Sequence, residues 1–347
     1  MNGEKEVKDT SLQGSFAGQR PTRERVGLVV DGTNAAAAVT TIATAEAAGV
    51  RQIWMTQSPS NPDTLTIFAA SVSASAAAAA AAAKTSTIRL GTSIVPTYPR
   101  HPLALAQQAL AINDIAPGRL RLGIGPSHRP IIEGVYGLPQ STPLAHLREY
   151  LQILRAALWE GKVNHQGRFF NVVATMTRTA KIPLLISTLG EKAFELAGEI
   201  SDGAISWLCP ISYLLQTGMP ALRKASAASS GRSSEPPLVA HVLVALSQDD
   251  PLILEKGHQM LSFYAKLPFY AKMFTDAGFP ITAKDGNETI VPDALVDNLI
   301  ISGNESEVAV RFKELLSTGL GELMVTLVPI IDAIDEQTRL MHLIGGL

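Results

Sequence analysis

Two short segments of the sequence carry residues that could bind a ligand or move a proton. In GIGPSH, residues 123–128, Gly125 allows close approach of the backbone, and Ser127 and His128 supply hydrogen-bond donors just beyond it. In TLGEKAFELAGEISDG, residues 188–203, Thr188 to Gly190 lead into a helix whose free N–H groups could bind a phosphate. Both patterns are also typical of ordinary turns between a strand and a helix, so neither is decisive alone.

A third segment, RLGTSIVPTYPRHP, residues 89–102, begins as an apolar strand and ends in a stiff basic loop. The loop contains Pro96, Pro99 and Pro102 around the pair Arg100 and His101. Proline cannot donate a hydrogen bond to a sheet, so strand pairing must stop here. The sequence therefore predicts that a buried strand ends at a rigid loop.

The composition is that of a folded globular protein without an obvious charged partner. The 347 residues are 46% hydrophobic and 17% charged, with a formal net charge of −2. This balance gives no reason to expect nucleic acid or a membrane as partner. The single cysteine, Cys209, excludes an intrachain disulfide and a cysteine zinc site and fits the reducing cytoplasm. The alanine-rich run Ala74–Lys84 is too short to span a bilayer and is expected to be helical.

Apolar runs alternate with helical segments along the chain. The predicted strands lie near residues 26–32, 52–57, 87–95, 120–125, 182–188, 202–208, 237–247 and 322–329. They are apolar on both faces, which is typical of a parallel sheet covered by helices. Eight such units predict an α/β fold of the (β/α)8 TIM-barrel type. An open doubly wound sheet is the alternative, but VVDGTN after the first strand is not a glycine-rich dinucleotide fingerprint.

We expect one barrel domain over residues 25–347, preceded by a disordered extension, residues 1–24, that mixes charges with Gly, Ser and Gln. The chain is longer than a minimal barrel, which is typically about 250 residues. The surplus is assigned to the extension and to insertions near residues 126–181 and 249–318.

In such a barrel the active site lies at the carboxyl ends of the strands. The positions selected by this rule are Asp31, Gln57, Ser93 to Pro96, Gly125 to His128, Ser187 to Gly190, Trp207, Cys209 and Val328–Pro329. They contain few carboxylates, and the sequence has no HExxH, P-loop or GxSxG motif, so no metal site is predicted. Glycines, hydroxyls, amides and imidazole suit a large planar cofactor that itself supplies the difficult chemistry.

Three segments together resemble the bacterial luciferase-like superfamily, and closely its branch of coenzyme F420-dependent oxidoreductases. They are RLGTSIVPTYPRHPLALAQQA, GRLRLGIGPSH and LAGEISDGAISW, in the order and spacing of that family. The resemblance covers nearly the whole chain from Val26 onward. It implies a (β/α)8 barrel, a homodimer, and F420 or alternatively FMN bound at the carboxyl ends of the strands.

The resemblance also implies roles for individual residues. It places a non-prolyl cis peptide between Ser93 and Ile94, forming a bulge behind the central ring of the deazaflavin. The cofactor-binding residues that it implies are Gln57, Ser93, Ile94, Gly125, Ser127, Ser187, Thr188, Leu189 and Gly190, of which residues 187–190 match the family's phosphate-contacting turn. Arg100 and His101 face either the anionic tail of the coenzyme or solvent.

His128 is the predicted catalytic residue. It matches the position where related glucose-6-phosphate dehydrogenases carry a glutamate that donates a proton, and histidine can do this near neutral pH. Those enzymes also have a histidine at the end of the second strand, where this chain has Gln57, which can hydrogen-bond but cannot act as a base. Oxidation of a sugar phosphate is therefore not expected. Trp54 and Trp207 either line the substrate side of the ring or belong to the core.

Three functions remain open on these grounds. The first is an F420-dependent oxidoreductase that transfers a hydride between the deazaflavin C5 and a small organic substrate. The second is an FMN-dependent two-component monooxygenase of the same superfamily, because reduced FMN activates oxygen whereas the deazaflavin does not. The third is a barrel that binds a flavin or deazaflavin without turnover.

Overall fold

Eight parallel strands close into a barrel in the computed structural model, which describes residues 20–77, 86–229, 235–284 and 288–347. In order around the barrel they are β1 (Val26–Val29), β2 (Gln52–Met55), β3 (Arg89–Thr92), β5 (Leu120–Gly125), β8 (Leu184–Thr188), β9 (Gly203–Ser206), β10 (Leu238–Ala245) and β14 (Glu322–Leu327). Pairing of β9 with β10 and of β14 with β1 closes the ring. The predicted TIM-barrel fold is thereby confirmed, and the open-sheet alternative is wrong.

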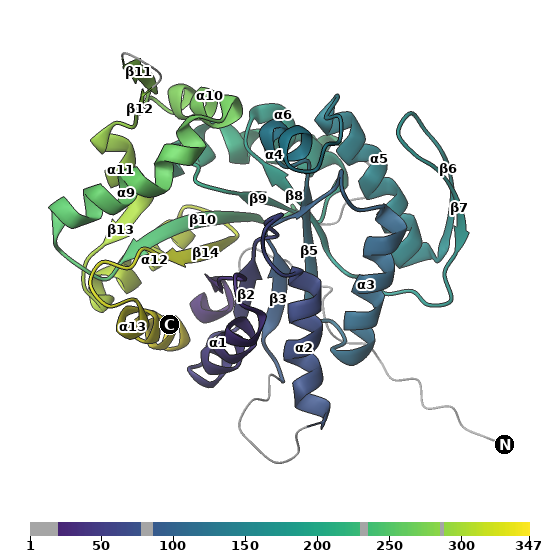
Figure 1. The fold of residues 1–347 in the computed structure, drawn as a ribbon, viewed down its shortest axis with the longest axis horizontal. Helices are drawn as coiled ribbons and strands as arrows, with labels where there is room; N and C mark the ends of the chain where they lie inside the picture. The colour runs from purple at the N-terminus through teal and green to yellow at the C-terminus, as the bar shows by residue number, and fades with distance from the viewer. Residues whose placement is uncertain (1–19, 78–85, 230–234, 285–287) are drawn as a thin grey trace.

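Helices surround the barrel and cover the outer faces of the strands (Figure 1). They are α1 (Ala35–Ala47), α2 (Thr64–Ala77), α3 (Pro102–Ile115), α5 (Pro143–Arg155), α6 (Glu191–Ile200), α7 (Ile211–Tyr213), α8 (Met219–Ala228), α12 (Glu305–Ser317) and α13 (Ala333–Gly345). Local sequence sets their starts. The Asn34 side chain accepts a hydrogen bond from the Ala37 N–H at 2.9 Å, and Asn304 and Glu307 form a capping box on α12. Among the described residues, no helix combines the length and the apolar character needed to cross a bilayer.

The segments of the two predicted insertions contain additional elements as well as helices of the barrel, namely α5 in the first and α12 in the second. The first contains the short helix α4 (Arg129–Gly134), α5 with its π-helical continuation Ala156–Glu160, and the hairpin of β6 (Lys162–Gln166) and β7 (Asn171–Thr175). The second contains α9 (Asp250–Ala265), α10 (Pro268–Asp276), the hairpin of β11 (Thr282–Lys284) and β12 (Glu288–Ile290), and α11 (Asp293–Leu299). It ends in β13 (Ile300–Ser302), which pairs with β10 of the barrel sheet. A second π-helical turn, Leu214–Gly218, joins α7 to α8. Figure 1 shows the two hairpins on opposite sides of the barrel.

A tryptophan fills the middle of the barrel. Trp54 is completely buried and packs with Leu185, Ile205, Val239 and Met324. It fits because the neighbouring strands carry glycine: a Cβ on Gly27 or Gly91 would collide with the indole ring. The guanidinium of Arg121 lies 4.4 Å from the ring centroid on the side toward the amino ends of the strands. Trp54 therefore belongs to the core rather than to a ligand site.

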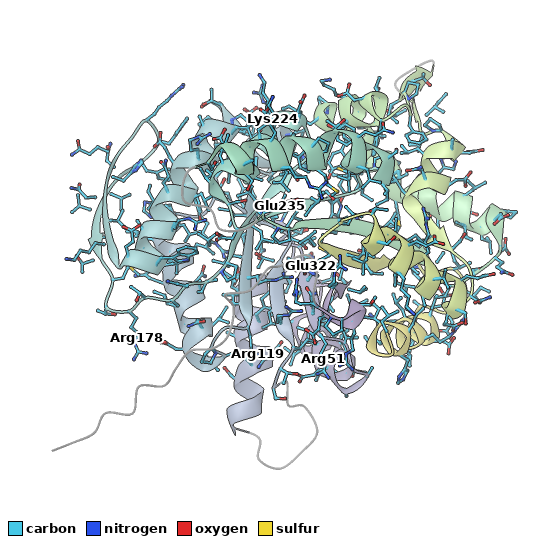
Figure 2. All side chains as sticks on the ribbon, turned by 180° about the vertical axis from the view of Figure 1, so that it is seen from behind. Arg51, Arg119, Arg178, Lys224, Glu235 and Glu322 are labelled. Carbon is cyan, nitrogen blue, oxygen red and sulfur yellow. The ribbon has the colours of Figure 1, made fainter. Side chains whose placement is uncertain are left out.

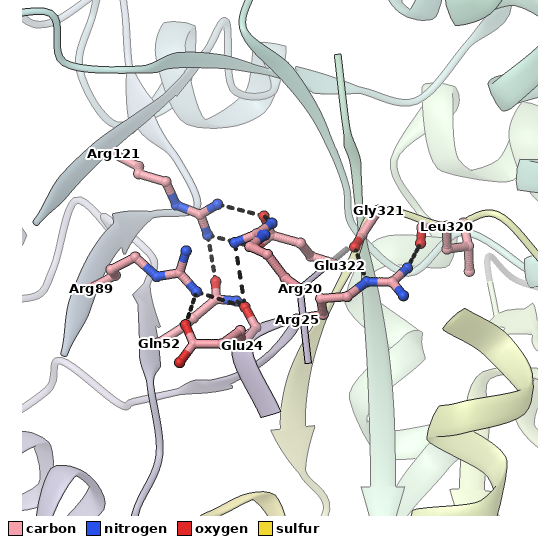
Figure 3. A network of polar contacts seen from close by, with 9 residues as sticks. All are labelled: Arg20, Glu24, Arg25, Gln52, Arg89, Arg121, Leu320, Gly321 and Glu322. Atoms are coloured by element: carbon pink, nitrogen blue, oxygen red, sulfur yellow. Dashed lines mark hydrogen bonds and ion pairs between the residues drawn. The ribbon is translucent and has the colours of Figure 1, made fainter. Parts of the chain in front are cut away.

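The amino ends of the strands are closed by a buried polar network centred on Glu322 (Figure 3). Glu322 is fully buried and accepts hydrogen bonds from Arg121 at 2.8 and 2.9 Å and from Arg20 at 2.6 Å. Arg121 also donates to Gln52 at 2.6 Å. Burial alone raises the pKa of Glu322, but the facing arginines outweigh it and lower that pKa to about 2. Figure 2 shows Glu322 near the centre of the molecule, whereas Arg178 and Lys224 lie at its periphery.

The end of the expected N-terminal extension takes part in this network. Residues 20–24, assigned to the extension by composition, include Arg20, which pairs with Glu322, and the 3₁₀ turn Thr22–Glu24, whose Glu24 pairs with Arg89 at 3.0 Å. A composition-based boundary missed this contact because the partner of Arg20 is some 300 residues away in sequence. The remainder of the extension, residues 1–19, lies outside the described residues, as do residues 78–84 of the alanine-rich run.

The network makes a prediction about stability. Replacing Glu322 by Gln removes the negative charge and leaves the buried guanidinium groups uncompensated, which typically costs about 3–5 kcal/mol. We expect E322Q to lower the free energy of unfolding, measured by urea titration at pH 7, by about 3 kcal/mol. The pKa of Glu322 is lower in the folded state than in the unfolded state, so its ionised form stabilises the fold near neutral pH. As the pH falls below about 4, this stabilisation is progressively lost, and the difference in free energy of unfolding between wild type and E322Q should shrink.

Glu314 provides the matched control for this variant. It forms an exposed ion pair with Arg311 on α12, and E314Q should change the free energy of unfolding by less than about 0.5 kcal/mol. Equal effects of E322Q and E314Q would contradict a stabilising role for the buried network.

Candidate functional site

A cavity of about 1210 Å³ opens at the carboxyl ends of the barrel strands. Its floor and sides come from the ends of β2, β3, β5, β8 and β9, and its far wall comes from α9 and α10 of the second insertion. A cavity of this size exceeds what a drug-sized ligand requires and is large enough for a cofactor together with a small second molecule. The position is the one where barrel enzymes place their active sites.

The structure brings nearly all of the predicted site residues to this cavity. Those that line it are Gln57, Ser93, Ile94, Ser127, His128, Ser187, Thr188, Leu189 and Gly190. Gly125 does not line it. A Cβ at that position would instead overlap the Ser187 hydroxyl, so Gly125 lets β5 and β8 approach each other.

A bulge at the end of β3 forms part of the floor. Gly91 of β3 pairs with Arg121 of β5, and Val95 of the short strand β4 (Val95–Pro96) pairs with Ile124 of β5. The segment from Gly91 to Val95 is therefore one residue longer than the β5 segment opposite it, which defines a bulge. Next to the bulge, the Thr92 hydroxyl donates to the Gly123 carbonyl of β5 at 2.7 Å and accepts from the Gly123 N–H at 2.9 Å. The Ser93–Ile94 peptide within the bulge is cis, as predicted.

The bulge presents two different groups to the cavity. Ile94 packs against the barrel core that contains Trp54 and presents an apolar surface to the cavity. The Ser93 N–H donates to the Met55 carbonyl at 2.8 Å, which ties the bulge to β2. The Ser93 Oγ is buried and has no hydrogen-bond partner among the described residues. A buried hydroxyl without a partner is costly, so a bound ligand would satisfy it.

The turn from β8 into α6 supplies a helix N-terminus to the same cavity. Its N-cap is Gly190, which has no side chain to bond the N–H groups of the first turn. A Cβ added to Gly190 would meet no atom within 4 Å, so the space in front of the helix is open. The Thr188 hydroxyl donates to the Ile205 carbonyl at 3.2 Å and fixes the turn on β9. This geometry suits an anionic group such as a phosphate.

Four of the described charged residues line the cavity. Glu191 and Lys192 belong to the first turn of α6, and Lys272 in the middle of α10 pairs with Asp276 at 2.7 Å. Burial, with negative groups that include Asp276 and Glu191, raises the pKa of Tyr213 to about 12.

His128 lies at the start of α4 and lines the cavity. It follows Ser127, whose φ of 58° is unusual for a residue other than glycine. This backbone is held by the Gln140 side chain, which donates to the Pro126 carbonyl at 2.8 Å. The His128 ring centroid lies 5.4 Å from that of Tyr270, and burial lowers the pKa of His128 below 6.5. The imidazole is therefore mainly neutral at pH 7 and able to accept a proton.

Gln57 has a mainly structural set of contacts. Its side-chain oxygen accepts from the Thr64 N–H at 2.8 Å and its amide nitrogen donates to the Ser58 carbonyl at 3.1 Å. The residue thus holds the start of α2 beside the cavity while one face of its amide remains part of the lining.

The basic pair of the proline-rich loop does not reach the cavity lining. Arg100 forms an ion pair with Asp63 at 2.6 Å, and the His101 ring accepts from the Leu103 N–H at 3.2 Å as the N-cap of α3. The loop therefore joins the starts of α2 and α3, and neither side chain contributes to the site in this structure.

Four aromatic residues of the second insertion form a wall of the cavity that the sequence patterns did not indicate. This aromatic wall consists of Phe263, Tyr264, Phe269 and Tyr270 from α9 and α10, and Met273 of α10 lines the cavity beside it. The segment 263–272 repeats the tetrapeptide FYAK at a spacing of six residues, a signal that could have attracted attention to it. Trp207, at the end of β9, joins this wall because its indole N–H donates to the Tyr264 hydroxyl at 3.1 Å.

Comparison with known proteins assigns the family. The model of the luciferase-like monooxygenase family matches residues 16–322, and the chain therefore belongs to this family. An uncharacterized protein of Mycobacterium tuberculosis is 28% identical over 210 residues, 56% of this chain, and the match spans only 62% of that relative. An F420-dependent glucose-6-phosphate dehydrogenase of Kineococcus radiotolerans is 25% identical over 252 residues, 70% of this chain and 72% of the relative.

Solved structures agree on the fold. An F420-dependent secondary alcohol dehydrogenase in complex with an F420–acetone adduct superposes with a TM-score of 0.73 at 16% identity, over 92% of this chain and 97% of the other. An EDTA monooxygenase from Chelativorans superposes with a TM-score of 0.68 at 12% identity, over 93% of this chain and 94% of the other. At these identities the likeness shows the fold, which is shared by proteins of different chemistry.

The position of His128 makes a prediction that needs no substrate. In proton NMR spectra, the ring signal that is lost in H128N should titrate with a midpoint below 6.5, because burial disfavours the charged ring. The melting temperature of H128N should stay within a few degrees of the wild type, since the His128 side chain makes no capping hydrogen bond to α4. A midpoint above 6.5 would mean that the ring is more solvated, or closer to a negative charge, than in this structure.

Proposed function

We propose that the chain is a coenzyme F420-dependent oxidoreductase that transfers a hydride between the deazaflavin C5 and a small organic substrate. The observation that carries this proposal is the arrangement of one cavity with an apolar shelf at Ile94 and an open, uncapped helix N-terminus at Gly190. A planar ring that bears a phosphate side chain requires both features. The F420-dependent relatives among the proteins compared support the choice of this cofactor.

The residues present fit such a cofactor on two independent counts. Ser93 offers a buried hydroxyl that has no partner among the described residues, and the space beyond Gly190 is open. Ile94 would support one face of the ring, while residues 187–190, the first-turn N–H groups of α6 and Lys192 would bind the phosphate. The bound coenzyme supplies a two-electron hydride donor or acceptor at one ring carbon.

The chain's own residues then have limited tasks. The aromatic wall and Ile94 exclude water from the space between them. His128, mainly neutral at pH 7, accepts a proton from the substrate or, once protonated, returns it. Gln140 fixes the loop that carries His128 and thereby its distance from whatever lies on Ile94.

The test is a titration of the purified full chain with F420 and, separately, with FMN, followed by the change in cofactor fluorescence. We expect saturable binding of F420 that is tighter than that of FMN. Tighter binding of FMN, together with oxygen uptake that depends on added reduced FMN, would favour the monooxygenase instead. The absence of saturable binding of either cofactor would contradict both functions.

A variant pair locates the binding site. Gly190→Val places a side chain in the open space at the N-terminus of α6, and it should weaken F420 binding by at least about tenfold, because several N–H contacts to the phosphate are lost. Gly134→Val is the matched control, since a Cβ at Gly134 also meets no atom within 4 Å but the residue lies outside the cavity lining. Equal affinity of the two variants for F420 would place the phosphate elsewhere.

A further inference from the structure

The Tyr264 hydroxyl in the aromatic wall has a hydrogen for which the described residues provide no acceptor. The indole Nε1 of Trp207 lies 3.1 Å from the Tyr264 Oη. An indole N–H can only donate, so the Tyr264 oxygen accepts this bond and its own hydrogen must point elsewhere. None of the described residues accepts that hydrogen, and Tyr264 lines the cavity. The hydrogen is therefore available to a bound molecule.

The position of this hydroxyl is fixed from below by the barrel. The Trp207 ring stacks on His241 with centroids 3.7 Å apart and an angle of 9° between the planes. His241 in turn bonds the Leu208 N–H at 3.3 Å and the Thr326 hydroxyl at 2.9 Å, so both ring nitrogens are engaged. The orientation of Trp207, and through it that of Tyr264, is thus set before any ligand binds, which lowers the entropic cost of binding.

Aromatic rings border the Tyr264 hydroxyl. The Tyr264 ring packs edge-on against Tyr270 with centroids 4.9 Å apart, and Tyr270 also contacts His128. Phe263 and Phe269, which are 50% and 60% exposed, form an apolar entrance to the cavity. Of the charged lining residues, Glu191 and Lys192 belong to α6, and Lys272 and Asp276 on α10 pair with each other at 2.7 Å. A charged substrate on this wall would therefore lose its hydration without gaining an unpaired counter-charge.

We infer that Tyr264 is a substrate-binding residue and that the substrate is an uncharged, largely apolar molecule whose single acceptor oxygen, such as a ketone carbonyl, bonds the Tyr264 hydroxyl. That this molecule is the substrate rests on the proposed function. Tyr264 and His128 both contact the Tyr270 ring, so an oxygen held by Tyr264 lies on the same wall as the imidazole. The aromatic wall would favour substrates with an apolar surface, and the Tyr264 hydroxyl would favour those with an acceptor oxygen at the matching position.

Two fluorinated probes of the same shape test this inference. They are 4-fluoroacetophenone, which carries a carbonyl, and 1-ethyl-4-fluorobenzene, which has a methylene in its place. Binding to the full chain is followed by fluorine NMR, and F420 affinity is measured separately. We expect the ketone to bind at least about fivefold more tightly than the hydrocarbon, as one hydrogen bond to a preorganised donor allows.

Tyr264→Phe removes the hydroxyl and keeps the ring. The variant should bind the ketone with an affinity within about twofold of its affinity for the hydrocarbon. Its affinity for the hydrocarbon, its affinity for F420 and its melting temperature should be nearly the same as those of the wild type. Tyr98→Phe is the matched control, because the Tyr98 hydroxyl donates to the Ser141 carbonyl at 2.8 Å outside the cavity lining. It should leave the preference for the ketone intact.

Three results would overturn the inference: equal affinity of the wild type for both probes, no binding of either probe, or the same ketone affinity in Y264F and Y98F. A loss of F420 affinity in Y264F without a change for the ketone would assign the hydroxyl to the cofactor and also overturn it. If the wild type prefers the ketone but does not bind F420, the proposed function fails while the donor role of Tyr264 stands.

Discussion

Closure of the parallel barrel is the constraint on which the other features depend. Because β9 pairs with β10 and β14 pairs with β1, all eight strands end at one rim, and residues from distant parts of the chain meet there. The interior must then be filled. Trp54 fills it at the price of glycine at positions 27 and 91, and the Glu322 network closes the other end. The core and the amino ends of the strands are thus filled, and the cavity lies at the carboxyl ends.

The rim and the second insertion are joined by a continuous set of contacts. His241 on β10 stacks on Trp207 at the end of β9, and Trp207 bonds Tyr264 on α9. Burial lowers the pKa of His241 to about 3, so its ring stays neutral and both of its hydrogen bonds persist at physiological pH. The aromatic wall is therefore positioned by the barrel and not by the insertion alone.

The sequence predicted what depends on local pattern. Strands that are apolar on both faces, Asn34 as a helix cap, and the turns carrying Ser127 and Gly190 could be read without a structure, and the bulge at Ser93–Ile94 followed from resemblance. Contacts between distant segments could not be read in this way. Examples are Arg20 with Glu322 and Gly125 facing Ser187. The loop pair Arg100–Asp63 belongs to the same group.

The aromatic wall shows the same limit most clearly. Phe263, Tyr264 and Tyr270 lie in an insertion that contacts the rim through Trp207, and their own periodicity does not reveal this contact. Aromatic residues at helical spacing are usually core residues, so their types alone did not indicate a site. Only the shared cavity distinguishes them.

A crystal structure of the chain with bound F420 tests the central claim most directly. We predict that the deazaflavin ring lies on Ile94 with its other face toward Tyr264 and Tyr270, and that its phosphate lies at the N-terminus of α6 beside Gly190. Density for the ring away from Ile94, or a phosphate bound at a different turn, would contradict the assignment of this cavity to hydride transfer.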